Sequence, residues 1–218
     1  MVNKLGIDIH LVEKKRHESA IHLNSELISN INWKDPHKVK KYLTKERGEF
    51  FEEIARILQL NSVDIKDKPV ADVGCGSGAL FHILAEKLHG NNFVGFDFSE
   101  ESLKVAEKIF PGAKYVHYNI YDSYPGNFHL TLCTEVIEHL MDPEIALKNL
   151  MAMTADNGWV LITVPDGRKD QFEGHINFWS PESWERFIQK NADNCRYSCG
   201  KIGKQNFYAL LQKPPFSS

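Results

Sequence analysis

Short apolar runs alternate with amphipathic segments along most of the chain, and this alternation predicts an α/β fold. Val70–Val73 and Phe93–Phe96 are apolar runs of strand length, and each is followed by apolar residues at helical spacing. Strands are predicted over residues 70–73, 93–96, 114–118, 128–133, 159–164, 196–202 and 207–211. Helices are predicted over residues 79–88, 100–109, 142–153 and 182–190. The alternation indicates a doubly wound sheet in which most strands are parallel.

The first sixty residues have a less regular pattern. Residues 1–32 are of mixed polarity, with loose helical spacing over Val12–Ser29, and they are interpreted as an arm or lid, with a mobile extension as the alternative. A helix is predicted to begin at Asp35-Pro36, because proline is tolerated in a first turn, and to run to Leu60 as a cap. The predicted organisation is an arm over 1–33, a domain over 34–212 that includes the cap helix 34–60, and a tail over 213–218.

A glycine-rich turn joins the first predicted strand to its helix. Its glycines alternate along GCGSG, where a Cβ would hold a ligand away from the backbone, and the following helix offers free N–H groups. The second strand ends at Asp97, whose carboxylate can bind both hydroxyls of a ribose. Asp72 would repel a pyrophosphate but suits a cation such as S-adenosylmethionine (SAM). An NAD-dependent oxidoreductase stays open, because Gly74-x-Gly76-x-x-Ala79 also fits the dinucleotide fingerprint.

Two of these segments resemble a known family. VADVGCGSG resembles motif I of class I SAM-dependent methyltransferases, and GFDFS over Gly95–Ser99 resembles their ribose-binding motif. The resemblance covers about residues 39–211 and implies a Rossmann-like sheet of seven strands with one antiparallel strand. It also implies that an arginine binds the methionine carboxylate of SAM. At Asn119 the chain departs from the family, which often has an aspartate that hydrogen-bonds the adenine amino group. The amide oxygen of Asn119 could accept the same bond. The implied cofactor-binding residues are Arg47, Asp72, Gly74, Cys75, Gly76, Gly78, Asp97, Phe98, Ser99, Asn119, Ile120, Thr134 and Glu135.

Candidate catalytic residues follow the fourth and fifth strands. Glu135, Glu138 and His139 are spaced i, i+3, i+4, so a helical turn would place them on one face, and His175 could join them from the next loop. Such a set would suit a divalent metal, Mg or Mn. The E-x-x-E-H pattern resembles ubiquinone-type O-methyltransferases, which act on catechols and phenols, and small-RNA 2′-O-methyltransferases. The alternative needs no metal: Glu135 lines the cofactor pocket and His139 is a general base. Glu135, His139 and His175 are the predicted catalytic residues.

Composition narrows the function classes. The 218 residues carry a formal net charge of −3, which favours a small-molecule acceptor over a polyanion. Methylation of that acceptor on oxygen is what the resemblance to ubiquinone-type O-methyltransferases implies. RNA stays open because residues 34–47 are basic, and a non-catalytic SAM-binding module is a third interpretation. No apolar run approaches the ~20 residues of a membrane span and no signal-peptide pattern is present, so a cytoplasmic location is expected. The four cysteines suggest no disulfide framework, and nothing indicates the oligomeric state.

Overall fold

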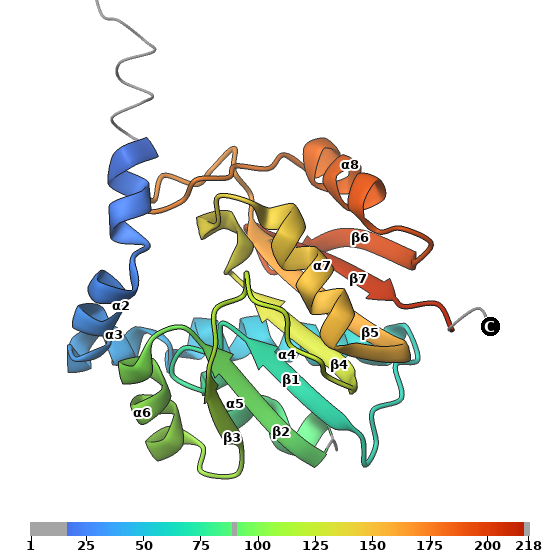
Figure 1. Ribbon diagram of the computed structural model, residues 1–218, viewed down its shortest axis with the longest axis horizontal. Helices are drawn as coiled ribbons and strands as arrows, with labels where there is room; N and C mark the ends of the chain where they lie inside the picture. Colours follow the sequence, from blue (N-terminus) through green and yellow to red (C-terminus); the bar gives the residue numbers. More distant parts are fainter. Residues whose placement is uncertain (1–16, 89–90, 216–218) are drawn as a thin grey trace, which may run out of the picture.

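The computed structural model describes residues 17–88 and 91–215, and in this part of the chain it contains one seven-stranded sheet (Figure 1). The strands are β1 (Pro69–Val73), β2 (Asn91–Asp97), β3 (Lys114–His117), β4 (Phe128–Thr134), β5 (Thr154–Pro165), β6 (Arg196–Ile202) and β7 (Asn206–Gln212). Their order is β3-β2-β1-β4-β5-β7-β6, and β7 is antiparallel to both of its neighbours while the other pairs are parallel. The predicted Rossmann-like fold with one antiparallel strand is confirmed.

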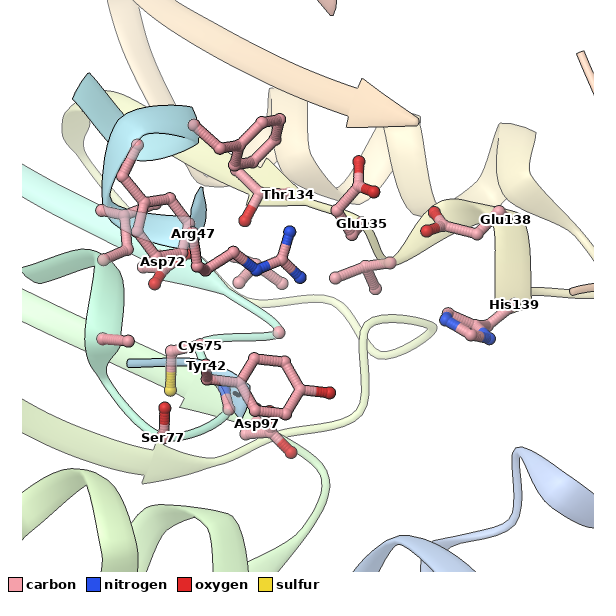
Figure 2. Close-up of a pocket in the computed structure, with 18 of the residues that line it drawn as sticks. Tyr42, Arg47, Asp72, Cys75, Ser77, Asp97, Thr134, Glu135, Glu138 and His139 are labelled. Atoms are coloured by element: carbon pink, nitrogen blue, oxygen red, sulfur yellow. Dashed lines mark hydrogen bonds between the residues drawn. The ribbon is translucent and has the colours of Figure 1, made fainter. Parts of the chain in front are cut away.

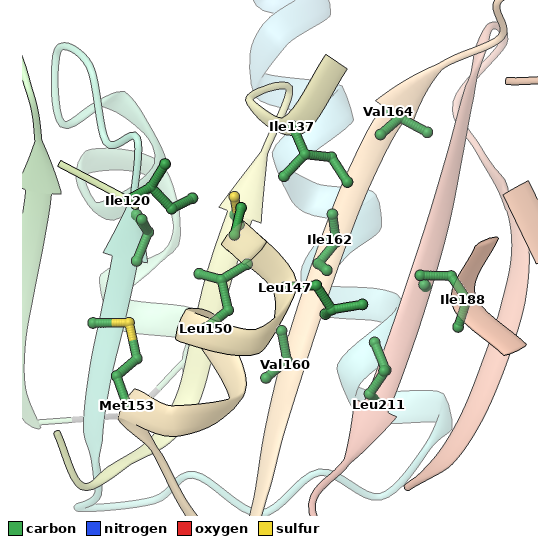
Figure 3. Close-up of a cluster of buried hydrophobic side chains, with 14 of the residues drawn as sticks. Ile120, Ile137, Leu147, Leu150, Met153, Val160, Ile162, Val164, Ile188 and Leu211 are labelled. Atoms are coloured by element: carbon green, nitrogen blue, oxygen red, sulfur yellow. The ribbon is translucent and has the colours of Figure 1, made fainter. Parts of the chain in front are cut away.

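Helices cover both faces of the sheet. On one face α4 (Lys45–Leu60) and α5 (Ala79–Leu88) form a cluster with β1 and β4, and α6 (Glu100–Ile109) lies beside α5, β2 and β3. On the other face α7 (Pro143–Met153) and α8 (Pro181–Asn191) pack on β4, β5 and β7. Val160 and Ile162 of β5 join this second cluster, whereas Leu161 joins the first, as the alternation of a two-sided buried strand requires (Figure 3). β1 and β4 therefore lie at the centre of the core, with their carboxyl ends next to each other.

Local capping signals explain why most helices begin where the sequence predicts. Ser99 accepts a hydrogen bond from Ser102 N at 3.2 Å at the start of α6. Ser180 and Ser183 form a reciprocal capping box at the start of α8. The observed α5 and α6 have the predicted bounds, and α7 and α8 match within one residue.

The predicted continuous helix from residue 35 to Leu60 is wrong. Asp35 does cap a helix, but α3 (Pro36–Lys41) ends after six residues and α4 begins separately at Lys45. The cause is Thr44, which is extended (ψ 159°) and accepts a hydrogen bond from Arg47 N at 3.3 Å, so that it starts a new helix. Rather than capping from outside, α4 buries Phe50, Ile54 and Leu58 in the core.

The arm contains two helical segments, residues 17–23 and α2 (Glu26–Trp33), separated at Asn24 and by the N-cap Ser25. The prediction of a single helix over residues 12–29 is therefore wrong for residues 17–29, and residues 12–16 lie outside the described residues. Residues 1–16 of the predicted arm and 216–218 of the predicted tail also lie outside them, so the domain boundaries stay predictions. Among the described helices, none is both long and apolar enough to span a bilayer.

The fifth strand begins earlier than the predicted residues 159–164. β5 starts at Thr154 and includes Asn157 and Gly158. Asn157 has a left-handed φ of 60°, and the pairing with β4 shifts between Phe128 and Leu130. The chain thus makes a bulge inside the strand.

Candidate active site

The glycine turn after β1 forms the floor of a large cleft. Gly74 and Gly76 have φ values of 77° and 51°, a region that residues with a Cβ rarely occupy, and a Cβ on Gly74 would collide with Val136. Gly78 N donates to Cys75 O at 2.9 Å as the turn enters α5. Cys75 is buried, and burial raises the pKa of its thiol well above the ordinary value. Cys75 can therefore serve a ligand through its backbone and not as a thiolate.

Asp97 ties the second strand to this turn. Its Oδ2 accepts from Gly76 N and its Oδ1 from Ser99 N, both at 2.9 Å. The carboxylate is 7% exposed, and burial raises its pKa. Phe98 lines the same cleft, and Ser99 caps α6 directly behind Asp97. The predicted ribose-binding residues are thus assembled around one buried carboxylate.

Asp72 is a buried acid that lines the cleft beside the glycine turn. The residue is 1% exposed, and among the described residues no group hydrogen-bonds its Oδ1. Burial, with a smaller contribution from the charge of Asp97, raises the pKa of Asp72 to about 8. A positively charged group at this position would allow the carboxyl to ionise.

Asn119 and Ile120 lie after β3 and line the cleft. The amide oxygen of Asn119 accepts a hydrogen bond from Tyr121 N at 3.0 Å, so the residue forms a local Asx turn. Ile120 is 9% exposed. The adenine-binding role of both residues stays a prediction.

Arg47 projects from α4 into the middle of the cleft (Figure 2). Its guanidinium carbon lies 5.3–5.6 Å from the ring centroids of Tyr42, Phe50 and Phe51. These rings hold the positive charge of Arg47 near Glu135. Burial raises the pKa of Glu135, and the charge of Arg47 lowers it by a smaller amount. The structure thus places the predicted arginine in the lining of the cleft, and its role toward the cofactor stays a prediction.

Glu135 does not share a face with Glu138 and His139, and the expectation that it does is wrong. Residues Ile137–His139 form a single 3₁₀ turn, η1, and Glu135 precedes it with a left-handed φ of 56°. Its carboxylate accepts from Thr163 Oγ1 at 2.9 Å and from Asn206 Nδ2 at 2.6 Å. Glu135 therefore points toward β5 and β7, away from the other two residues.

Glu138, His139 and His175 do come together, and we call them the acid–imidazole cluster. One donor atom from each lies within 4.8 Å of those of the other two, and Figure 2 shows Glu138 and His139 side by side. The loop after β5 brings in His175, because Ile176 N and Asn177 N both donate to Glu138 O, at 2.8 and 3.0 Å. His175 Nδ1 in turn hydrogen-bonds the carboxylate of Asp170.

Charges in the acid–imidazole cluster are unbalanced. Glu138 is fully buried, and among the described residues no group hydrogen-bonds either carboxylate oxygen, although His175 Nε2 lies 3.8 Å from Oε1. Burial raises the pKa of Glu138 well above the ordinary value. Burial, followed by the charge of His175, lowers the pKa of His139 to about 4. His139 is thus a neutral imidazole at neutral pH, and an ionised Glu138 requires a positive partner.

Residues 42–191, well over half of the chain, match a family described as a methyltransferase domain. The chain belongs to the methyltransferase domain family. With the fold and the glycine turn, this match confirms the expectation of a class I SAM-dependent methyltransferase, and it does not support the NAD-dependent oxidoreductase alternative. SAM is accordingly the cofactor of this methyltransferase.

Relatives and solved structures agree with the assignment. A ubiquinone biosynthesis O-methyltransferase from Thiobacillus denitrificans is 32% identical over 117 residues, which cover 49% of this chain and 50% of the relative. The chain thus spans about half the length of the curated relatives it matches. The N-methyltransferase NodS from Bradyrhizobium japonicum, solved with S-adenosyl-L-homocysteine, has a TM-score of 0.68 at 16% identity over 91% of this chain and 98% of its own. A SAM-dependent methyltransferase from Aquifex aeolicus has a TM-score of 0.65 at 18% identity over 82% of this chain and 98% of its own.

Three side chains of the methyltransferase site had no signal in the sequence. Asn24, Asp170 and Asn206 hold His139, His175 and Glu135 respectively, from positions outside every motif. A short asparagine or aspartate in a loop predicts only a turn. Their roles emerge from contacts between distant segments.

Proposed function

We propose that this methyltransferase transfers the methyl group of SAM to a hydroxyl oxygen of a small molecule. The observation that carries the proposal is that the Asp97 side and the acid–imidazole cluster line one continuous cleft. A cofactor at the glycine turn would therefore face an acceptor at His139. Relatives named ubiquinone biosynthesis O-methyltransferases, about 30% identical over half their length, favour oxygen as the methylated atom.

We propose for the cofactor residues the roles that the sequence predicts. Asp72 would face the cationic methionine part of SAM and Arg47 its carboxylate. Asp97 would bind the ribose hydroxyls, and Phe98, Asn119 and Ile120 would contact the adenine. The backbone at the glycine turn and at Thr134 would close the site around the sulfonium.

Replacing Asp97 with alanine is expected to weaken SAM binding by about 1.5–3 kcal/mol, because hydrogen bonds to a charged acceptor are lost. Isothermal titration calorimetry measures the change. Asp122→Ala, which removes an exposed carboxylate outside the cleft, is the matched control. Unchanged SAM affinity in Asp97→Ala would exclude the ribose-binding role.

The acid–imidazole cluster fits a divalent cation. Two orphaned carboxylate oxygens of Glu138, buried beside two imidazole rings, form an oxygen and nitrogen donor set that Mg²⁺ or Mn²⁺ accepts. Glu138, His139 and His175 would hold the ion, whereas Glu135, which the sequence adds to this set, is directed elsewhere. When bound, such an ion would lower the pKa of an acceptor hydroxyl.

The protein's own groups supply orientation and proton acceptance. Where no ion is bound, His139, which is unprotonated at neutral pH, can accept the proton of an acceptor hydroxyl on its free ring nitrogen. With an ion bound, that nitrogen would be an ion ligand instead. Phe172 lines the cleft with its ring centroid 4.9 Å from that of His175, which provides an apolar wall for an aromatic acceptor. Holding the acceptor oxygen in line with the methyl–sulfur bond provides much of the rate through proximity. Glu135, fixed by Thr163 and Asn206, would shape the boundary between the two ligands.

Mn²⁺ is expected to bind the wild type and to bind Glu138→Gln about 10-fold or more weakly, because the only acidic ligand of the three loses its charge. Calorimetry measures this, and Glu144→Gln, an exposed glutamate on α7, is the control. Equal Mn²⁺ affinity in both variants would remove the metal from the proposal. Catechol and labelled SAM then test the reaction itself by transfer of label to oxygen.

RNA is the second candidate acceptor. The last turn of α3 carries three lysines, and two of them, Lys38 and Lys41, line the cleft. Label transferred to an RNA 2′-hydroxyl instead of catechol, with binding that weakens steeply as salt rises, would favour this candidate. Tight SAM binding with no transfer to either acceptor would favour a non-catalytic module.

A further inference from the structure

The N-terminal arm reaches directly into the acid–imidazole cluster. Asn24 follows the helical residues 17–23, which Figure 1 shows beside the loop after β5. Its Nδ2 donates to Gly174 O at 2.7 Å and to His139 O at 3.1 Å. Its Oδ1 lies 3.0 Å from Nδ1 of His139. One side chain thus joins the arm, η1 and the loop that carries His175.

These contacts fix the orientation of the amide. The two carbonyl oxygens can only accept, so the Asn24 NH₂ group must face them and the Asn24 oxygen must face the imidazole. A flipped amide would set its oxygen against two carbonyl oxygens. His139 Nδ1 therefore faces two acceptors, Asn24 Oδ1 at 3.0 Å and Gly174 O at 3.1 Å.

The same contacts select one tautomer of His139. With two acceptors at Nδ1, the neutral ring carries its proton there, and the lone pair is left on Nε2. Asn24 provides one of the acceptors and holds the other, the Gly174 carbonyl, in place. Nε2 is the nitrogen that remains for an acceptor hydroxyl or an ion.

Asn24 is held in place by a well-seated arm. Asn24 N donates to the carbonyl oxygen of the buried Ala20 at 3.1 Å. Six residues further along, Asn30 Oδ1 accepts from Ser99 Oγ at 2.7 Å and from Glu101 N at 3.2 Å, behind the ribose-binding Asp97. Asn30 thus docks the arm at the cofactor end of the cleft without contacting the cluster.

We propose that Asn24 is a positioning residue, which holds the imidazole of His139 in the Nδ1–H tautomer with Nε2 available to the cleft. The proposal rests on the proposed function for its effect on catalysis. The tautomer itself is a property of the chain and can be measured without cofactor, metal or turnover.

The test uses protein with ¹⁵N-labelled histidine, in which two-bond ¹H–¹⁵N NMR distinguishes a protonated from an unprotonated ring nitrogen. The His139 signals are assigned by their loss in His139→Gln. We expect a protonated Nδ1 and an unprotonated Nε2 in the wild type, and a mixture of tautomers in Asn24→Ala.

Kinetics complete the test. Asn24→Ala is expected to lower kcat by about 10- to 100-fold with little change in KM for SAM, as the loss of an outer partner of a functional histidine does. Asn30→Ala, the matched control on the same arm, is expected to raise KM for SAM and to leave the His139 NMR pattern unchanged. These opposite effects separate positioning of His139 from docking of the arm.

Two results would overturn the proposal: a wild-type His139 pattern in Asn24→Ala, or a shift of the pattern in Asn30→Ala equal to that in Asn24→Ala. Failure of the proposed function looks different. In that case His139→Gln and Asn24→Ala transfer methyl groups as the wild type does, while the tautomer still changes in Asn24→Ala.

Discussion

His139→Ala is expected to lose about 10²–10⁴-fold in kcat while it binds SAM as the wild type does. The imidazole is half-buried, and two hydrogen-bond acceptors at Nδ1 orient it. Its pKa is lowered to about 4, so the ring is neutral at neutral pH. Its removal would take away the group that is proposed to accept the proton of the methyl-acceptor hydroxyl or to bind an ion, and it would leave the glycine turn and Asp97 unchanged. Single-turnover rates with labelled SAM and catechol measure the loss.

His82→Ala is the matched control for this variant, since His82 is exposed on α5 and does not line the cleft. It is expected to react at the wild-type rate. A wild-type kcat in His139→Ala would show that the acceptor loses its proton without help from this residue, and the acid–imidazole cluster would then be structural.

SAM affinity is expected to rise about 50-fold between pH 6 and pH 8. Without ligand, Asp72 has a pKa of about 8 and is protonated below that pH. A cationic ligand stabilises the carboxylate, so binding below pH 8 must release a proton, and the affinity falls as the pH falls. Calorimetry in buffers of different ionisation enthalpy counts the released proton directly.

Two comparisons assign this dependence to Asp72. Asp72→Asn is expected to bind SAM with little pH dependence, and 5′-methylthioadenosine, which lacks the cationic groups, is expected to bind the wild type equally at pH 6 and pH 8. For the unliganded fold the sign is opposite: the raised pKa makes stability fall as pH rises from the ordinary value of 3.8 toward about 8. A SAM affinity that stays flat across this range in the wild type would mean that Asp72 does not meet the cation.

The cofactor half of the site could be predicted from sequence because its signals are local. The glycine turn, the strand that ends at Asp97 and the cap at Ser99 all lie within a stretch of some thirty residues, and each is a short-range feature of the backbone. The structure places Gly74, Gly76 and Asp97 in the lining of one cleft, whereas Ser99 does not line it. Periodicity likewise located the strands, because two-sided burial produces apolar runs that do not depend on distant partners.

The acceptor half could not be predicted in the same way. A single left-handed φ at Glu135 turns its side chain away from Glu138, and this conformation is held by Asn206, 71 residues away. Asn24 is 115 residues from His139. The spacing i, i+3, i+4 specifies a shared face only for a regular helix, and a 3₁₀ turn preceded by a left-handed residue breaks that assumption.

The insertion of β7 between β5 and β6 has a consequence for biosynthesis. β7 is the last described strand to leave the ribosome, yet it lies inside the sheet. Until it pairs, β5 presents an open edge of apolar residues that can join another nascent chain. Asn206 arrives with the same strand, so Glu135 lacks its amide partner until then. Pairing of β7 with β5 therefore covers this apolar edge and brings Asn206 to Glu135 in one step.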